Sequence, residues 1–175
     1  MEEFILIRPT EEYASQIAEY RKEFLEADNS MDGCGPLRRF EDPLEYIKTC
    51  KEYEDPKTVP SHLVPATQWF FVRKSDGKLV GMLQVRHCFN EYLEKYAGHI
   101  GYSVRPCERR KGYAKKMLKM ALPFCREIGL EKVLISCIDG NVGSEKTILA
   151  NGGVYESTVL EPNTNRYLKR FWISL

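Results

Sequence analysis

A short stretch near the middle of the chain constrains the fold more than any other part of the sequence. Residues 98–114 read GHIGYSVRPCERRKGYA. The residues over 100–105 predict a strand, and Pro106 opens a turn after it. Three consecutive cations at 109–111 then lead to Gly112, where an apolar helical pattern begins. The stretch therefore predicts a strand, a basic loop and a helix in direct succession.

The start of this helix has the properties of an anion site. Backbone N–H groups in the first turn of a helix have no intrahelical acceptor, and the helix dipole adds partial positive charge there. Gly112 lets a phosphate approach the main chain, and the preceding cations add further charge. Taken alone, the motif fits a solvated basic turn as well, so its context has to distinguish the two.

That context is a resemblance to a known family. The pattern Arg-x-x-Gly-x-Ala over residues 109–114, between a strand and an amphipathic helix, resembles the acetyl-CoA signature of the GNAT family of N-acetyltransferases. Residues 98–153 follow the order of that family's core. The resemblance implies an α/β fold with a central mixed, mostly antiparallel sheet flanked by helices. It also implies that the strands near residues 100 and 135 splay apart to admit the cofactor.

The rest of the chain predicts a single α/β domain over residues 1–175. Strands are expected over 4–7, 68–74, 78–88, 100–105, 133–138, 154–160 and 166–173. Helices are expected from Thr10 to about residue 28, over 44–53 after Pro43, from Gly112 to Gly129, and over 141–150. Between them, residues 28–42 are expected to form a long loop and residues 90–97 a short helix or lid.

Composition limits the classes of function. The chain has 26 basic and 25 acidic residues and a net charge of +1, which argues against a nucleic-acid partner bound by overall charge. No apolar run is long enough to span a membrane, and the acidic start MEEFILIRP lacks the features of a signal peptide. We therefore expect a cytoplasmic protein without a membrane partner. The six cysteines are scattered, as reduced thiols would be, and the three histidines lack metal-ligand spacing, so no metal is expected.

The resemblance implies acetyl-CoA as cosubstrate and also implies which residues hold it. The backbone of residues 102–104 would pair with the pantetheine arm, and the Val104 N–H would polarise the thioester carbonyl. The backbone amides of 110–114 would hold the pyrophosphate. Asn141 and Ser144 match the family's Asn-x-x-Ala/Ser element, in which Asn141 bonds the pantetheine region and can also cap a helix. The implied cofactor-binding set is Tyr102, Ser103, Val104, Arg109, Arg110, Lys111, Gly112, Tyr113, Ala114, Asn141 and Ser144.

For catalysis, the resemblance implies direct attack of a deprotonated amine on the thioester. An alkylamine has a pKa of about 10.4, so a base or a water relay has to assist. His99 occupies the position of a glutamate in many relatives and is the candidate base. Many relatives carry a tyrosine acid at the position of Ile148, so Tyr155 or Tyr102 is the candidate acid here, unless the thiolate leaves unassisted. A covalent route through Cys107 is a further alternative.

The acceptor pocket is expected where the 28–42 loop and the 92–96 segment approach the sheet. Four acidic residues are candidate anchors for a cationic amine on a small molecule or peptide: Asp32, Glu41, Glu91 and Glu94.

Two alternatives to acetyl transfer to an amine stay open. The chain could transfer another acyl group or use another acceptor, such as a hydroxyl. It could also bind acyl-CoA without turnover, as a sensor module, which the isoleucine at 148 allows. The tail KRFWISL is either core or a homodimer contact.

Overall fold

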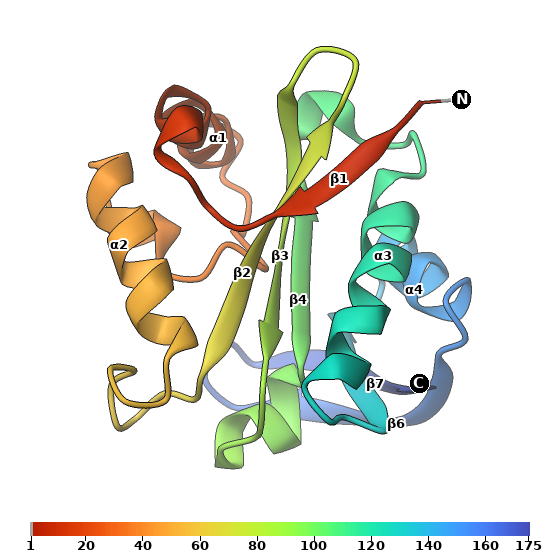
Figure 1. Cartoon of the computed structure of the whole chain (residues 1–175). Helices are drawn as coiled ribbons and strands as arrows, with labels where there is room; N and C mark the ends of the chain where they lie inside the picture. Colours follow the sequence, from red (N-terminus) through yellow and green to blue (C-terminus); the bar gives the residue numbers. More distant parts are fainter. Residues whose placement is uncertain (1) are drawn as a thin grey trace.

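The computed structural model describes residues 2–175, and its elements follow the sequence pattern closely. The strands are β1 (Phe4–Ile7), β2 (Ala66–Arg73), β3 (Lys78–Arg86), β4 (Ile100–Val104), β5 (Lys132–Ile138), β6 (Val154–Glu161) and β7 (Arg166–Ser174) (Figure 1). The helices are α1 (Ala14–Glu26), α2 (Pro43–Glu54), α3 (Tyr113–Glu127) and α4 (Val142–Leu149). Short helical turns cover Glu11–Tyr13, Leu37–Arg39, Leu93–Ala97 and Pro106–Glu108. The short helix expected within residues 90–97 is therefore present.

The strands form two antiparallel sheets, in the orders β1-β2-β3-β4 and β5-β7-β6. The expected α/β fold is confirmed, with the central sheet divided between β4 and β5. The two sheets meet only near the start of β4, where Gly98 forms an isolated bridge with Ile135 and the His99 N–H donates to Leu134 O at 2.7 Å. Beyond that point β4 is a free sheet edge, which is the splay that the resemblance implied.

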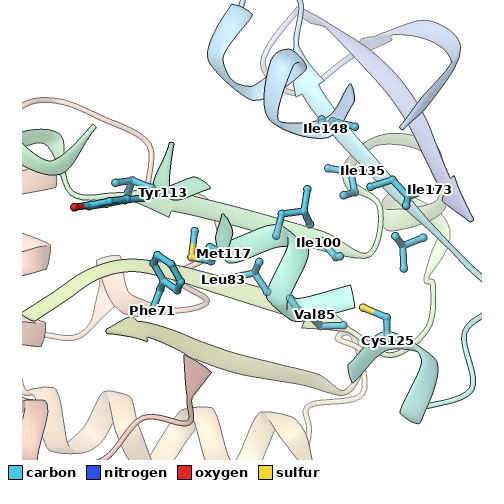
Figure 2. Close-up of a cluster of buried hydrophobic side chains, with 14 of the residues drawn as sticks. Phe71, Leu83, Val85, Ile100, Tyr113, Met117, Cys125, Ile135, Ile148 and Ile173 are labelled. Carbon is cyan, nitrogen blue, oxygen red and sulfur yellow. The ribbon is translucent and has the colours of Figure 1, made fainter. Parts of the chain in front are cut away.

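Helices cover both faces of the four-stranded sheet (Figure 1). On one face, α3 buries a stripe that includes Met117, Leu118 and Cys125; Figure 2 shows Met117 and Cys125 beside Leu83 and Val85 of β3. On the other face, α1 and α2 bury aromatic and aliphatic side chains against β2 and β3. Both faces are therefore packed, and of the two edge strands, β1 and β4, it is β4 that borders the cavity described below.

The loop between α1 and α2 lies directly on β4. Gly33 has a φ of +72°, and a Cβ built on it would lie 2.3 Å from Gly101 O. A side chain at Gly101 would in turn meet the Gly33 backbone N at 3.0 Å. Two glycines thus bring two backbones into contact that no larger residues would allow. This contact makes the loop a wall of the cavity described next.

Candidate active site

A cavity of about 1420 Å³ runs along the open edge of β4. One end is formed by residues 108–110 and 112–115, the middle by β4, β5 and the start of α4, and the other end by Tyr92 and Tyr96. The loop over 29–39 lines the cavity from Asn29, which contacts Arg109, toward Tyr92 and Tyr96. Typical sites for one small ligand occupy about 300–1,000 Å³, so this cavity has room for two substrates placed end to end. We call its two ends the anion loop (residues 109–114) and the acceptor end.

The anion loop presents backbone donors that the protein leaves unpaired. Arg110 and Gly112 have left-handed φ angles of +62° and +79°. This alternation turns successive N–H groups toward one point, as in the backbone concavities that bind anions. Within residues 2–175 the N–H groups of 110–112 reach no acceptor, and no side chain caps α3.

Gly112 itself is not required by packing. A Cβ at this position would meet no heavy atom within 4 Å. Its positive φ favours glycine, and the space beside it is open toward the cavity. The open space and the unpaired amides together fit a phosphate in contact with the main chain.

The three cations of the loop have different partners, which the sequence could not indicate. Arg109 braces the loop, since its Nε donates to Val104 O at 3.1 Å and its Nη1 to Asn29 Oδ1 at 2.9 Å. Lys111 donates to Glu108 Oε2 at 2.7 Å and, alone among the predicted cofactor residues, does not line the cavity. Among residues 2–175, Arg110 has no hydrogen-bond or ion-pair partner for its side chain, so it is the loop cation free to meet a ligand.

Glu108 is a structural residue of the site that the sequence analysis missed. Its buried carboxylate accepts from Arg73 at 3.0 Å, from Lys78 at 2.8 Å and from Lys111 at 2.7 Å. Burial alone would raise the pKa of this carboxyl, but the bonds from Lys111, Lys78 and Arg73 lower the pKa to about 2. The turn that precedes the anion loop is therefore fixed to the β2–β3 hairpin by a buried anion.

The edge of β4 offers two further backbone donors. The Arg105 N–H donates to Val80 O, and the Arg86 N–H to His99 O, so the odd-numbered residues of β4 pair with β3. In an antiparallel pair the intervening residues point their N–H and C=O groups the other way. Tyr102 and Val104 therefore direct their N–H groups out of the sheet edge, into the splay. This is where the resemblance places the pantetheine arm.

Side chains of β4 connect it to the neighbouring elements. The Tyr102 hydroxyl shares a 2.8 Å hydrogen bond with Ser144 Oγ on α4, so two predicted cofactor residues contact each other across the splay. Ser103 Oγ instead bonds Tyr20 OH at 3.0 Å, on the α1 side of the sheet. Asn141 caps α4, with its Oδ1 accepting from the Ser144 N–H at 3.1 Å. Asn141 and Ser144 both line the cavity.

The environment of His99 differs from that of a general base. Its ring is buried, its Nδ1 accepts the Leu134 N–H at 2.9 Å, and the residue does not line the cavity. Burial and then the nearby charge of Arg86 lower its pKa from 6.5 to about 4. A base with so low a pKa and a committed Nδ1 lone pair is a poor proton acceptor from an amine. These observations argue against the expected catalytic role and give His99 a structural one, bridging β4 and β5.

Two other candidates for chemistry also lie away from the cavity lining. Tyr155 is 53% exposed on β6 and bonds Thr158 Oγ1 at 2.8 Å. Cys107 is exposed, and its thiol lies 3.8 Å from Glu23 Oε2. Neither side chain is placed to meet a thioester, so Tyr102 is the better placed of the tyrosines considered from the sequence.

The segments from which the acceptor pocket was expected both line the cavity, whereas most of the expected acidic anchors do not. Loop residues 29–39 and the aromatic pair Tyr92 and Tyr96 line it. Of the four acidic anchors, Asp32 lines the cavity, while Glu41, Glu91 and Glu94 do not.

Sequence reasoning also missed Gln84 and Arg86 at the acceptor end. Both lie on β3 and line the cavity. The signal was available, since they are the polar residues at alternate positions in an otherwise apolar strand end, MLQVR, and so share one face.

Two classes of feature are absent from residues 2–175. No group of three or more histidine, cysteine, aspartate or glutamate side chains is placed to hold a metal ion. No helix in the same range has the length and apolarity needed to cross a bilayer.

Comparison with solved structures gives the same fold. The ribosomal-protein-S5-alanine acetyltransferase from Vibrio fischeri aligns over 99% of this chain and 94% of its own, with a TM-score of 0.73 and 17% identity. RimJ from Mycobacterium smegmatis, in complex with CoA-disulfide, aligns over 98% and 81%, with a TM-score of 0.72 and 15% identity. The microcin C7 self-immunity acetyltransferase MccE, in complex with acetyl-CoA and AMP, aligns over 99% and 93%, with a TM-score of 0.73 and 17% identity.

Sequence comparison identifies the family. No curated protein matches the chain. A family model described as the acetyltransferase (GNAT) family matches residues 35–150, which include β4, the anion loop and α4. With this match over most of its length, the chain belongs to the GNAT acetyltransferase family.

Proposed function

We propose that this protein transfers the acetyl group of acetyl-CoA to a primary amine by direct attack of the amine. The observation that carries the proposal is the series of unpaired backbone N–H groups along one cavity, at the β4 edge and in the anion loop. A pantetheine arm that ends in a diphosphate would satisfy both sets of donors at once. Membership of the GNAT family supports the same conclusion.

The residues present fit this cosubstrate. The amides of 110–114 would hold the diphosphate, with Arg110 as the free cation beside it. The N–H groups of Tyr102 and Val104 would pair with the arm, and the Val104 N–H would donate to the thioester oxygen as negative charge develops there. Asn141 would add a side-chain donor from the other side of the splay, because its cap uses only its oxygen.

When bound, acetyl-CoA supplies a carbonyl carbon activated as a thioester: the amine nitrogen forms the new C–N bond, the C–S bond breaks, and its electron pair leaves on sulfur. Burial raises the pKa of Tyr102 above its ordinary value of 10.0. A thiol has a pKa of about 8.5, so a thiolate is too weak a base to take the proton of Tyr102. Tyr102 would therefore donate a hydrogen bond to the departing sulfur rather than a proton, in exchange for its bond to Ser144, and the proton lost by the amine would pass to solvent through the open cavity.

The test is an amine panel assayed by release of the CoA thiol, alongside calorimetric titration of the protein with acetyl-CoA. We expect a saturable binding isotherm and turnover with at least one primary amine. Tight acetyl-CoA binding without turnover on any amine would support the sensor alternative. Faster turnover with a longer acyl-CoA would show that the protein transfers that longer acyl group in preference to acetyl.

A further inference from the structure

The acceptor end of the cavity carries more positive than negative groups. Its lining includes three arginines and two carboxylates: Arg39, Arg86, Arg166, Asp32 and Glu161. The Glu161 carboxylate keeps its charge but is held in its own turn, since it accepts the N–H groups of Asn163 at 3.0 Å and Thr164 at 2.7 Å. A site built for a purely cationic amine would show the opposite balance.

None of these arginines is neutralised within residues 2–175. Arg39 donates to Tyr53 OH at 3.4 Å, and this acceptor is uncharged. A further arginine of the lining, Arg38, donates to Asn29, which also accepts from Arg109, so Arg38 lies toward the anion loop. Arg86 donates through Nη1 to Gly98 O at 3.3 Å, and no carboxylate lies within ion-pair distance of it. The arginines at this end therefore lack a carboxylate in direct contact, and Asp32 acts on Arg86 from a longer distance.

Arg86 is the most constrained of the three. It is half-buried on β3, and its Nη2 lies 3.4 Å from the position that a Cβ of Gly101 would take. Burial lowers the pKa of its guanidinium, and the nearby Asp32 and Tyr92 partly offset this decrease. A desolvated cation without a counter-ion is costly, and a bound anion would offset that cost. Arg86 also lies next to the point where the open β4 edge begins at Tyr102.

We propose that the acceptor carries a carboxylate as well as its amine, and that Arg86 binds this carboxylate while the amine faces the β4 edge. The inference rests on the proposed acetyl transfer and names the substrate class. With Nη1 bonded to Gly98 O, the guanidinium keeps further N–H donors in one plane, which suits the two oxygens of a carboxylate. Free α-amino acids have this chemistry, as do peptides with an acidic residue next to the amino terminus.

The direct test measures binding to CoA-saturated protein by calorimetry, so it does not depend on turnover. The probes are protein α-amino acids, each compared with its α-amide and its decarboxylated amine. Dipeptides with an acidic second residue and O-phosphoethanolamine complete the panel. At least one carboxylate-bearing amine should bind about 10- to 100-fold more tightly than its amide, as expected of a charge-assisted pair. The dipeptides distinguish a peptide source from a free amino acid.

Variants locate the effect. Arg86→Met should remove the preference for the carboxylate and leave binding of the amides and of acetyl-CoA unchanged, while Arg86→Lys should keep part of it. Arg126→Met, on the exposed surface of α3, removes the same charge away from the cavity and should change nothing.

Equal binding of acids and amides by the native protein would overturn the inference, even if Arg86→Met does not fold. Tighter binding of O-phosphoethanolamine than of every carboxylate would overturn it too. Preferred turnover of the decarboxylated amines would do so while leaving acetyl transfer intact. Failure of acetyl-CoA to bind would instead remove the proposed function.

Discussion

The two ends of the cavity are built from different parts of the chain. The anion loop uses consecutive backbone N–H groups, oriented by the left-handed φ angles of Arg110 and Gly112. The acceptor end uses side chains from the 29–39 loop, from β3 and from the β6–β7 turn. A backbone site tolerates changes of side chain but not of conformation. A side-chain site has the opposite sensitivity, so substitutions can test the two ends separately.

The largest effect is expected from Gly112→Glu. The new carboxylate would occupy the open space beside the loop amides, repel a diphosphate and adopt an unfavourable φ. We expect acetyl-CoA affinity to fall by about 1,000-fold, since several charge-assisted bonds are lost. The matched control is Gly129→Glu, at the other end of α3, where φ is +89° and the space is equally open. Equal losses in both variants, measured by calorimetry, would show that strain rather than the site is responsible.

The anion loop also depends on a side chain, that of Glu108, which fixes the turn before it. Its pKa falls from 4.5 to about 2 on folding, so the carboxylate stabilises the native state above pH 4.5, and this contribution is lost as pH falls toward 2. At about 1.4 kcal/mol per pKa unit, the contribution is roughly 3 kcal/mol. Urea unfolding of Glu108→Gln should show that loss at pH 7 and a flatter pH dependence below pH 4.5. An unchanged acid limb would contradict the buried ion network.

His99 lies outside the cavity lining, and its substitutions can distinguish a structural role from a catalytic one. Asparagine can replace Nδ1 as acceptor of the Leu134 N–H, whereas leucine cannot, so His99→Leu should lose about 1–3 kcal/mol and His99→Asn much less. Because folding lowers the pKa of His99 from 6.5 to about 4, its stabilising effect is complete above pH 6.5 and declines as pH falls toward 4. His99→Asn should lack this decline and keep the pH profile of kcat/KM. Loss of the acidic limb of that profile would restore His99 as the base.

The smallest effect is expected from Arg110→Ala. The side chain adds charge near the anion loop, but under the proposal the unpaired backbone N–H groups would supply the directional bonds. Acetyl-CoA affinity should fall less than about tenfold, with a smaller loss in high salt, because exposed charges are screened. A loss as large as that of Gly112→Glu would show that side chains, rather than backbone N–H groups, supply most of the affinity for acetyl-CoA.

The sequence predicted the backbone-built end and most of the fold, for the same physical reason. A loop that binds through its own amides leaves its spacing in consecutive residues, and Gly112 is visible as such a signal. The strands and helices likewise follow local periodicity. The acceptor end depends on contacts distant in sequence, such as Gly33 on Gly101, so Arg86 was overlooked. The partners of Glu108 and the burial of His99 are also tertiary properties, which local pattern does not contain.

The central claim is that main-chain amides at the start of α3 bind the diphosphate. Proton–nitrogen correlation spectra of ¹⁵N-labelled protein, recorded during titration with coenzyme A, test it residue by residue. The account predicts that the amide protons of 110–114 move downfield together as new hydrogen bonds form, while that of Gly129 does not move. If coenzyme A binds with measurable heat but the amide resonances of 110–114 do not shift, the account is contradicted.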